Sequence, residues 1–230
     1  VVYLNTRKEE TAQNVDLLTD VVEKLQLEFI SIYDAVRNRI AKERGYADTI
    51  AFFANLQSKL GGTDSMRQST HHLPPLYRGA AKIQSRFNTE MERIAKVSKG
   101  VFTKSPLKHI FRIVEKMTLK HSGDRNLGRA DNVYDIVRCM VEYKTMAAMA
   151  AGIRALEKCE NVTVLRVKDR FSAPTPGGWM DVMASVEVKG DQNKHVCEVQ
   201  FVHKSLLAVR KGMGGHAEYA VYRSAAELLE

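Results

Sequence analysis

Two acidic residues stand out because they interrupt segments that otherwise have the composition of buried strands. Glu198 lies beside Gln200 in HVCEVQFVH (195–203), and Asp135 lies in VYDIVRCMVEY (133–143). β-Branched and aromatic residues fill most other positions of both segments, which is typical of strands. Magnesium in proteins is usually held by one or two carboxylates together with substrate phosphates. Asp135 and Glu198 are therefore a candidate pair of metal ligands.

Basic residues recur at a regular spacing ahead of the first of these strands. A helix over 104–120 would place every fourth residue on one face, which gives a cationic stripe of Lys104, Lys108, Arg112 and Lys116. The expected strand 162–171 adds Arg166 and Lys168. Cations that hold phosphates, beside carboxylates that hold magnesium, are the parts of a phosphoryl-transfer site. A solvated helix face with ordinary surface pairing is the alternative interpretation of the stripe.

Alternation along the strands places the polar residues on one side of the sheet. Glu198 and Gln200 lie on that side, with Trp179 and Asp181 from the expected strand 179–188. The simplest explanation is a sheet with helices on one face and water on the other. The single tryptophan, however, directly follows the loop SAPTPGG (172–178). An exposed Trp179 at that place would be a platform on which a base can stack.

The elements that must position these residues fall into two regions. Residues 1–100 are expected to be mostly helical, with apolar residues at helical spacing through 11–43, a second helix that stops at 61–62 and a third after the loop 63–75. Residues 101–230 follow the order α-β-α-β-β-β-α-α. We expect an α+β fold: a mixed β-sheet of four to five strands flanked by helices, preceded by an α-helical N-terminal region.

The bulk properties limit the classes of protein to consider. The chain has 230 residues and a formal net charge of +8, an excess that suits an anionic ligand such as a nucleotide or RNA. Three widely spaced cysteines predict buried free thiols and neither a disulfide framework nor a zinc site. The sequence shows no long apolar run and no signal-peptide pattern. We therefore expect no membrane segment and a cytoplasmic location, which is compatible with an effector or toxin domain delivered into another cell.

The order of motifs in 104–223 resembles the RelA/SpoT-type alarmone synthetase (nucleotide pyrophosphokinase) domain. The motifs are a basic helix (KSPLKHIFRIVEKM), a strand with an Asp and an Arg (YDIVRCMV), an RxKD-like strand with a Pro loop (RVKDRFSAPTPGGW), EVQFVH, and a closing helix with a His (HAEYAVYR). The resemblance implies a nucleotidyltransferase-like sheet. It also implies transfer of pyrophosphate from ATP to a hydroxyl of a nucleotide or RNA acceptor.

The resemblance also implies a role for each candidate residue. Asp135 and Glu198 would serve Mg2+ and the general-base step, and Trp179 would stack the acceptor base. The basic residues named above would hold the phosphates of ATP, and Gln200 and His216 would complete the nucleotide-binding set. The first hundred residues lack the His-Asp dyad of the family's hydrolase domain, so we expect no hydrolase activity.

The chain departs from the family pattern mainly on the acceptor side. GWMDVM stands in place of GYRSLH, EVQFVH stands in place of EVQIRT, and Asp135 precedes Arg138 by three residues where the family has five. A catalytically inactive nucleotide- or RNA-binding module of the same fold is therefore an open alternative. A third possibility is an interaction domain, in which the helical N-terminal region binds a protein partner or a second copy through Phe29, Ile32 and Val36.

Overall fold

The computed structural model describes residues 2–60, 66–119, 128–212 and 225. The elements in chain order are α1 (Val2–Ile40), α2 (Tyr46–Leu60), α3 (Leu73–Val97), β1 (Val101–Lys104), α4 (Ile110–Leu119), η2 (Ala130–Asn132), β2 (Arg138–Tyr143), α5 (Met146–Glu157), β3 (Val162–Asp169), β4 (Val182–Val188), β5 (Val196–His203) and α6 (Lys204–Gly212). Within the described residues, the strands form one sheet in the order β1-β2-β5-β4-β3. Only β2 and β5 pair in parallel in that sheet. The α+β class and the mixed sheet expected from the sequence are confirmed.

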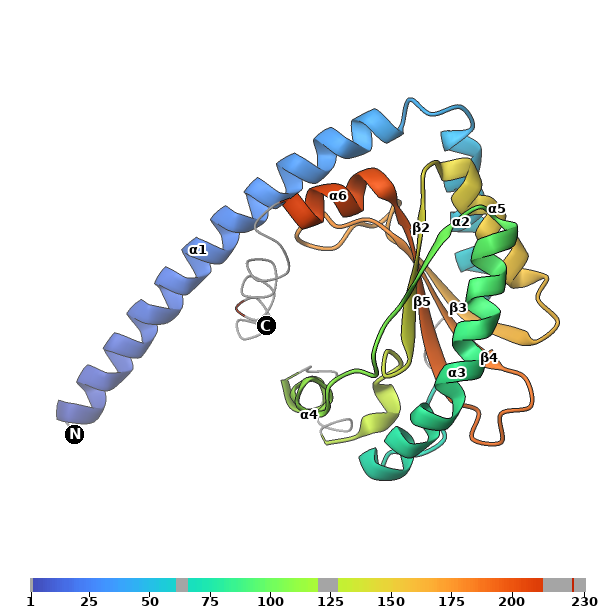
Figure 1. Cartoon of the computed structure of the whole chain (residues 1–230). Helices are drawn as coiled ribbons and strands as arrows, with labels where there is room; N and C mark the ends of the chain where they lie inside the picture. The colour runs from blue at the N-terminus through green and yellow to red at the C-terminus, as the bar shows by residue number, and fades with distance from the viewer. Residues whose placement is uncertain (1, 61–65, 120–127, 213–224, 226–230) are drawn as a thin grey trace.

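Helices lie on both faces of the sheet (Figure 1). α2, α3 and α5 cover one face, while α6 and the C-terminal half of α1 lie on the other, with α4 on that same side. Phe53 of α2, Ile83 of α3 and Leu207 of α6 belong to one continuous hydrophobic core. The helical region 1–100 and the region 101–230 therefore share a core. Among the described residues, no helix has both the length and the apolar character needed to cross a membrane.

The segment that follows α3 differs from the predicted helix over 104–120. Its first part is the edge strand β1, in which Lys104 lies opposite Cys139 of β2. Pro106 explains the late start of α4, because proline has no N–H to donate and disfavours helical backbone in the residue before it. Lys104 and Lys108 consequently lie outside the helix. The prediction of a single helical stripe of four cations is therefore wrong.

A bulge in β3 changes which side chains share a face. Val164 lies opposite Val186 of β4, but Arg166 lies opposite Ser185, so the register shifts between Val164 and Arg166. An extra residue in one strand turns the following side chains to the other face. Arg166 and Lys168 therefore face the same side of the sheet as Ser185, whereas Val164 does not. Uninterrupted alternation along the expected strand 162–171 would place Val164, Arg166 and Lys168 on one face.

The polar side of the sheet is buried. Asp181 is 0% exposed, Glu198 7% and Arg166 9%. α6 packs against β2 and β5 on this side, and α1 packs against α6. The interpretation of these residues as the wet face of a half-covered sheet is therefore wrong.

The proposed interaction stripe on α1 is largely internal. Phe29 is 6% exposed and Val36 packs against the core, whereas Ile32 is 40% exposed. α1 packs against the loop before β4 at Gly178, whose φ is +79°. A Cβ at Gly178 would lie 2.9 Å from the Cα of Ile30 and 3.4 Å from the Cβ of Tyr33. Glycine at position 178 is therefore what lets α1 pack closely on this loop.

The substitution Gly178→Ala should destabilise the fold by about 3 kcal/mol, because a left-handed alanine and a clash with helix backbone act together. Gly45→Ala is the matched control: Gly45 has a φ of +78° and nothing within 4 Å of an added Cβ. It should cost only the conformational strain, about 1 kcal/mol. Equilibrium urea unfolding of the two variants gives the comparison. Equal losses would show that the contact with α1 contributes nothing.

Candidate functional site

Asp135 is the centre of a cluster of cations just ahead of β2. The Lys108 Nζ donates a hydrogen bond to Asp135 Oδ2 at 2.6 Å, and the Lys116 Nζ donates to Oδ1 at 3.0 Å. The Arg138 Nη1 lies 3.9 Å from Oδ2. Two members of the predicted stripe, Lys108 and Lys116, thus do converge on a candidate carboxylate, although only Lys116 lies on the helix.

The electrostatics of this cluster favour a further anion. Burial tends to raise the pKa of Asp135, but the ammonium groups of Lys116 and Lys108 outweigh it and hold that pKa well below its usual range. Burial lowers the pKa of Lys108 despite the attraction of Asp135, and repulsion from Lys116 and Arg138 acts in the same direction. One ionised carboxylate therefore faces three cations, and the net charge of the group is positive.

Glu198 lies beside this cluster on the central strand β5. It is the parallel register partner of Arg138, and its backbone N–H donates to the carbonyl of Val137 at 2.9 Å. The Gln200 Nε2 donates to Glu198 Oε1 at 3.1 Å. Burial raises the pKa of Glu198, repulsion from Asp135 raises it further, and attraction to Lys116 offsets part of the shift. The two carboxylates are therefore close enough to influence each other, and Glu198 is the one suited to accept a proton.

Arg166 extends the site from β5 toward β3. The Arg166 Nη2 donates to the hydroxyl of Ser185 at 3.1 Å, and Ser185 is the register partner of Glu198. The guanidinium lies 5.2 Å from the ring centre of Tyr134. Burial lowers the pKa of Arg166, and Glu198 attracts its charge. The bulge in β3 is what turns this cation toward Glu198.

Trp179 is buried rather than exposed, so that part of the prediction is wrong. Its side chain is 4% exposed, and its Nε1 donates to Asp181 Oδ2 at 2.9 Å. Tyr33 of α1 packs edge-on at 5.6 Å between ring centres, and the Arg210 guanidinium lies 4.7 Å from the indole centre. A base cannot stack on the indole in this arrangement.

The remaining predicted residues lie at the margins of the site. Lys104 and Lys168 are exposed on β1 and β3. Arg112 forms an ion pair with Glu115 on the same helix, as the surface-pairing alternative expected. His216 lies outside the described residues. The structure thus gathers Lys108, Lys116, Asp135, Arg166, Glu198 and Gln200.

Two residues of the site escaped the sequence analysis. Uninterrupted alternation along the expected strand 133–143 would put Arg138 on the opposite side of the sheet from Asp135. Because β2 begins only at Arg138, Asp135 is free of that alternation and reaches the same side. Tyr134 packs under Arg166, and its hydroxyl donates to the carbonyl of Met66 at 2.7 Å. No sequence pattern predicts these contacts of Tyr134 with residues far away in the chain.

The carboxylates differ in how well they suit a magnesium ion. Across the described ranges, no group of three or more His, Cys, Asp or Glu side chains is placed to hold a metal. Glu198 fits a metal ligand, because its buried carboxylate has an amide donor on one oxygen and no ion pair among the residues described. Asp135 already has a lysine on each oxygen. One protein carboxylate plus substrate phosphates is a set of ligands that Mg2+ accepts.

Comparison with protein-family models and with curated proteins finds no match. Among solved structures, the chain is similar to small alarmone synthetase 1 from Bacillus subtilis bound to pppGpp, with 13% identity, 65% of this chain and 87% of that chain covered, and a TM-score of 0.47. Small alarmone synthetase 2 from the same organism gives 16% identity, coverage of 65% and 78%, and a TM-score of 0.47. The type VI effector Tas1, solved with its immunity protein, gives 17% identity, coverage of 56% and 60%, and a TM-score of 0.41. The two synthetases are of the type that the motifs resemble, and at these identities the likeness concerns the course of the chain and not the reaction.

The substitutions Asp135→Asn and Glu198→Gln should have opposite effects on stability. Removing the charge of Asp135 leaves Lys108 and Lys116 close together and uncompensated, which should cost about 3 kcal/mol. Removing the charge of Glu198 relieves a buried carboxylate, so the free energy of unfolding should stay unchanged or rise by about 1 kcal/mol. Urea unfolding at neutral pH measures both. If Glu198→Gln lost as much stability as Asp135→Asn, the conclusion that Glu198 has no ion pair among the described residues would be wrong.

Acid should remove the contribution of Asp135. Its pKa is lower in the folded chain than in the unfolded chain, so the stability it provides is present above the unfolded value of about 4 and is lost as the pH falls below that. Unfolding midpoints should fall less steeply below about pH 4 in Asp135→Asn than in the parent chain. If the unfolding midpoints of the variant and the parent chain fall equally steeply with pH, the lysines do not hold Asp135 ionised.

Proposed function

We propose that the chain is an ATP-dependent pyrophosphokinase that transfers pyrophosphate to a hydroxyl of a nucleotide or of RNA. The observation that carries this proposal is the pairing of Glu198, a buried carboxylate with a raised pKa, with a neighbouring cluster of net positive charge around Asp135. The first group suits proton abstraction and the second suits a polyphosphate. The ordered motifs from 104 to 223 support the same assignment.

The chemistry assigns a separate task to each group. Lys108, Lys116 and Arg138 bind the phosphates of ATP, and the arriving triphosphate competes with Asp135 for the lysines. Arg166 neutralises charge on the other side of Glu198. The acceptor hydroxyl oxygen forms a bond to the β-phosphorus while the bond from that phosphorus to the α,β-bridging oxygen breaks and AMP leaves. Glu198, oriented by Gln200, accepts the hydroxyl proton.

Magnesium, when bound, would neutralise charge on the phosphates of ATP. Of the two carboxylates, Glu198 would fit better as its protein ligand, because no lysine bonds to it among the described residues. Asp135 joins it only if Lys108 or Lys116 moves to the phosphates, which the competition for the lysines permits.

The burial of Trp179 favours one alternative, a nucleotide-binding module without transfer. With the indole sealed by Tyr33 and Arg210, the acceptor has no stacking surface at the place the family uses. This alternative retains ATP binding at the cations and predicts no turnover.

The test is incubation of the chain with γ-labelled ATP, Mg2+ and a panel of nucleosides, nucleotides and RNA ends. The proposal expects label in an acceptor product together with formation of AMP. Glu198→Gln should lower the rate by about 100-fold or more, because a general base typically contributes 100- to 10,000-fold. Label transfer to no acceptor, with ATP binding intact by calorimetry, would establish the binding module instead.

Glu187→Gln is the matched control for this assay. Glu187 lies on β4, and burial raises the pKa of its carboxyl as well. Glu187 is not paired with any of the cations around Asp135, so the loss of its charge should leave the transfer rate within about twofold. A loss as large as that of Glu198→Gln would mean that the effect reports burial and not chemistry.

A further inference from the structure

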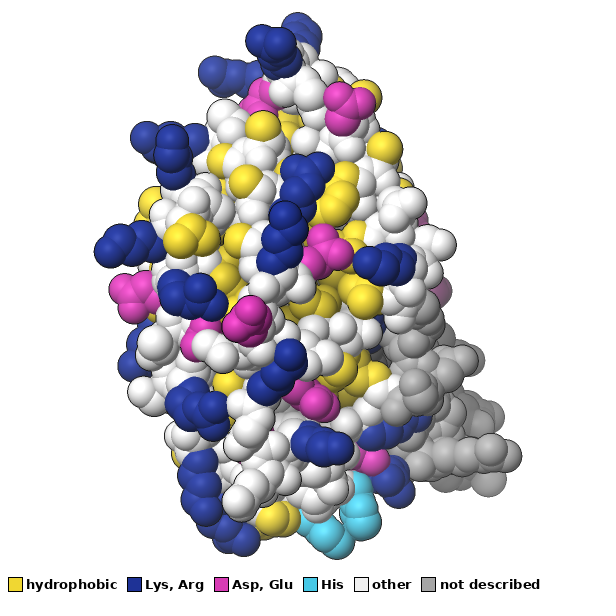
Figure 2. All heavy atoms as spheres, turned by 90° about the vertical axis from the view of Figure 1, so that its right-hand side faces the viewer, with side chains coloured by type: hydrophobic (Ala, Val, Ile, Leu, Met, Phe, Trp, Pro, Cys, Tyr) yellow, Lys and Arg dark blue, Asp and Glu magenta, His cyan; other side chains and the backbone are white. Residues whose placement is uncertain are grey.

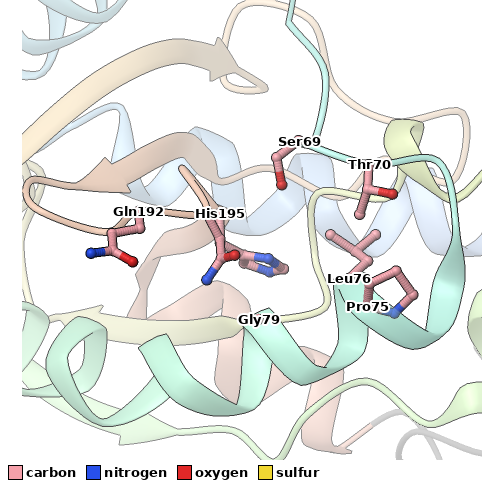
Figure 3. Close-up of a pocket in the computed structure, with 8 residues that line it drawn as sticks. Ser69, Thr70, Pro75, Leu76, Gly79, Gln192 and His195 are labelled. Atoms are coloured by element: carbon pink, nitrogen blue, oxygen red, sulfur yellow. The ribbon is translucent and has the colours of Figure 1, made fainter.

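A pocket lies on the opposite face of the sheet from Glu198. It has a volume of about 310 Å³ and is lined by three segments: the loop before α3, the first turns of α3 and the β4–β5 hairpin (Figure 3). Ser69 and Thr70 line it from the loop before α3. Pro75, Leu76 and Gly79 line it from α3, and Gln192, Asn193 and His195 line it from the hairpin. Its volume is at the lower end of that of small-molecule sites.

His195 is the residue that points to a ligand. Its side chain is 1% exposed, and neither ring nitrogen has a hydrogen-bond partner within the described part of the chain. Burial lowers the pKa of His195 to about 4, against the attraction of Asp191, so the ring is neutral at physiological pH. A buried polar group without a partner costs about 1–3 kcal/mol. His195 is one of the residues that line the pocket, so a ligand bound there is placed to supply the missing partner.

The alternation along β5 separates this pocket from the proposed active site. His195 immediately precedes β5 and is three residues from Glu198, so the two side chains lie on opposite faces of the sheet. The odd-numbered neighbours Cys197 and Val199 share the face of His195 and belong to the core. A ligand at His195 therefore cannot be the ATP or the acceptor of the proposed reaction.

The hairpin is held firmly against α3. Asp191 accepts hydrogen bonds from the backbone N–H of Asn193 at 3.1 Å and of His195 at 2.8 Å. A Cβ at Gly79 would lie 3.7 Å from Asn193, and one at Gly190 would lie 3.7 Å from the Arg86 Nη2. Arg86 donates to the carbonyl of Lys189 at 2.9 Å. The walls of the pocket are therefore fixed at both ends of the hairpin.

Basic residues predominate in the segments that line this pocket. The segments 66–86 and 189–195 together contain six Lys and Arg residues and a single acidic residue, Asp191: the cations are Arg67, Arg78, Lys82, Arg86, Lys189 and Lys194. All six are exposed. Figure 2 shows the face that carries α3, on which Lys and Arg side chains outnumber Asp and Glu. An uncharged pocket with several polar groups, between segments that carry exposed cations, suits a molecule with a neutral polar head and an anionic tail.

We propose that this pocket binds a nucleoside monophosphate, with its base among the hydroxyl, amide and imidazole groups and its phosphate on the exposed cations of the lining segments. A nucleobase is planar and neutral and offers donors and acceptors along one edge, which side-chain amides such as those of Gln192 and Asn193 can pair with. The volume admits one nucleoside and not a longer strand. The pocket is a site separate from that of the proposed reaction, and its occupation does not depend on that reaction.

The test is calorimetric titration of the full chain with AMP, GMP, CMP and UMP, and with the four nucleosides. We expect saturable binding of at least one monophosphate, at least about tenfold weaker binding of its nucleoside, and weakening with salt. Gly79→Leu should abolish this binding by filling the pocket, while Gly79→Ala, whose Cβ makes an ordinary contact, should retain it. Asp135→Asn and Glu198→Gln should also retain it, which separates this site from the proposed active site.

His195→Phe guards against a variant that merely fails to fold. A purely structural role predicts that His195→Phe melts at the same or a higher temperature and binds as before, because it removes an unpaired polar group. The proposal predicts a folded chain with about tenfold weaker nucleotide binding. It is overturned if no monophosphate binds, if Gly79→Leu or His195→Phe binds normally, or if nucleoside and nucleotide bind alike.

Discussion

A carboxylate buried on a central strand without an ion pair of its own sets the conditions for the rest of the candidate site. Glu198 is 7% exposed and has only the amide of Gln200 bonded to it among the described side chains. Burying an ionised carboxylate is costly, and a protein meets that cost with nearby charge or with a raised pKa. The chain does both: it surrounds the neighbouring Asp135 with cations and leaves Glu198 easier to protonate. The asymmetry between the two carboxylates follows from which of them the lysines reach.

That asymmetry depends on three local features of the backbone. Pro106 delays the start of α4, so Lys108 lies in the segment before the helix, from which it reaches Asp135. The late start of β2 frees Asp135 from the alternation of the strand. The bulge in β3 turns Arg166 to the face of Glu198. Each feature is small. Without one of them, Lys108 would not reach Asp135, Asp135 would not lie on the side of Arg138, or Arg166 would not face Glu198.

The sequence predicted most of the elements, because hydrophobic periodicity is a local property. Glu198 and Gln200 were placed on one face correctly, since β5 runs without interruption. β1 was missed because a four-residue edge strand with a mostly exposed surface has too short a pattern to recognise. Residues Arg166 and Lys168 were assigned to the right face for the wrong reason, because a bulge cannot be read from alternation alone.

The largest error concerned Trp179, and its cause is long-range. The loop composition around the indole predicted exposure, but α1, more than a hundred residues earlier in the chain, packs Tyr33 against it. Gly178 shows that this contact is specific, since the left-handed glycine and the absence of a side chain are both needed for Ile30 to approach. The sequence of a covered strand does not indicate that a helix from a distant part of the chain packs over it.

Two groups of basic residues, on opposite faces of the sheet, contribute to the net charge of +8. On one face, Lys108, Lys116 and Arg138 lie around the half-buried Asp135, so their positive charge is partly compensated. On the other, the segments around His195 carry exposed cations with only Asp191 beside them, and that carboxylate is already engaged by two backbone N–H groups. The first arrangement suits an anion that must be desolvated and positioned for chemistry, because fixed charges act most strongly where water is excluded. The second suits an anion that is attracted and held at a solvated surface, which makes the two faces of β5 suited to different uses of the same kind of ligand.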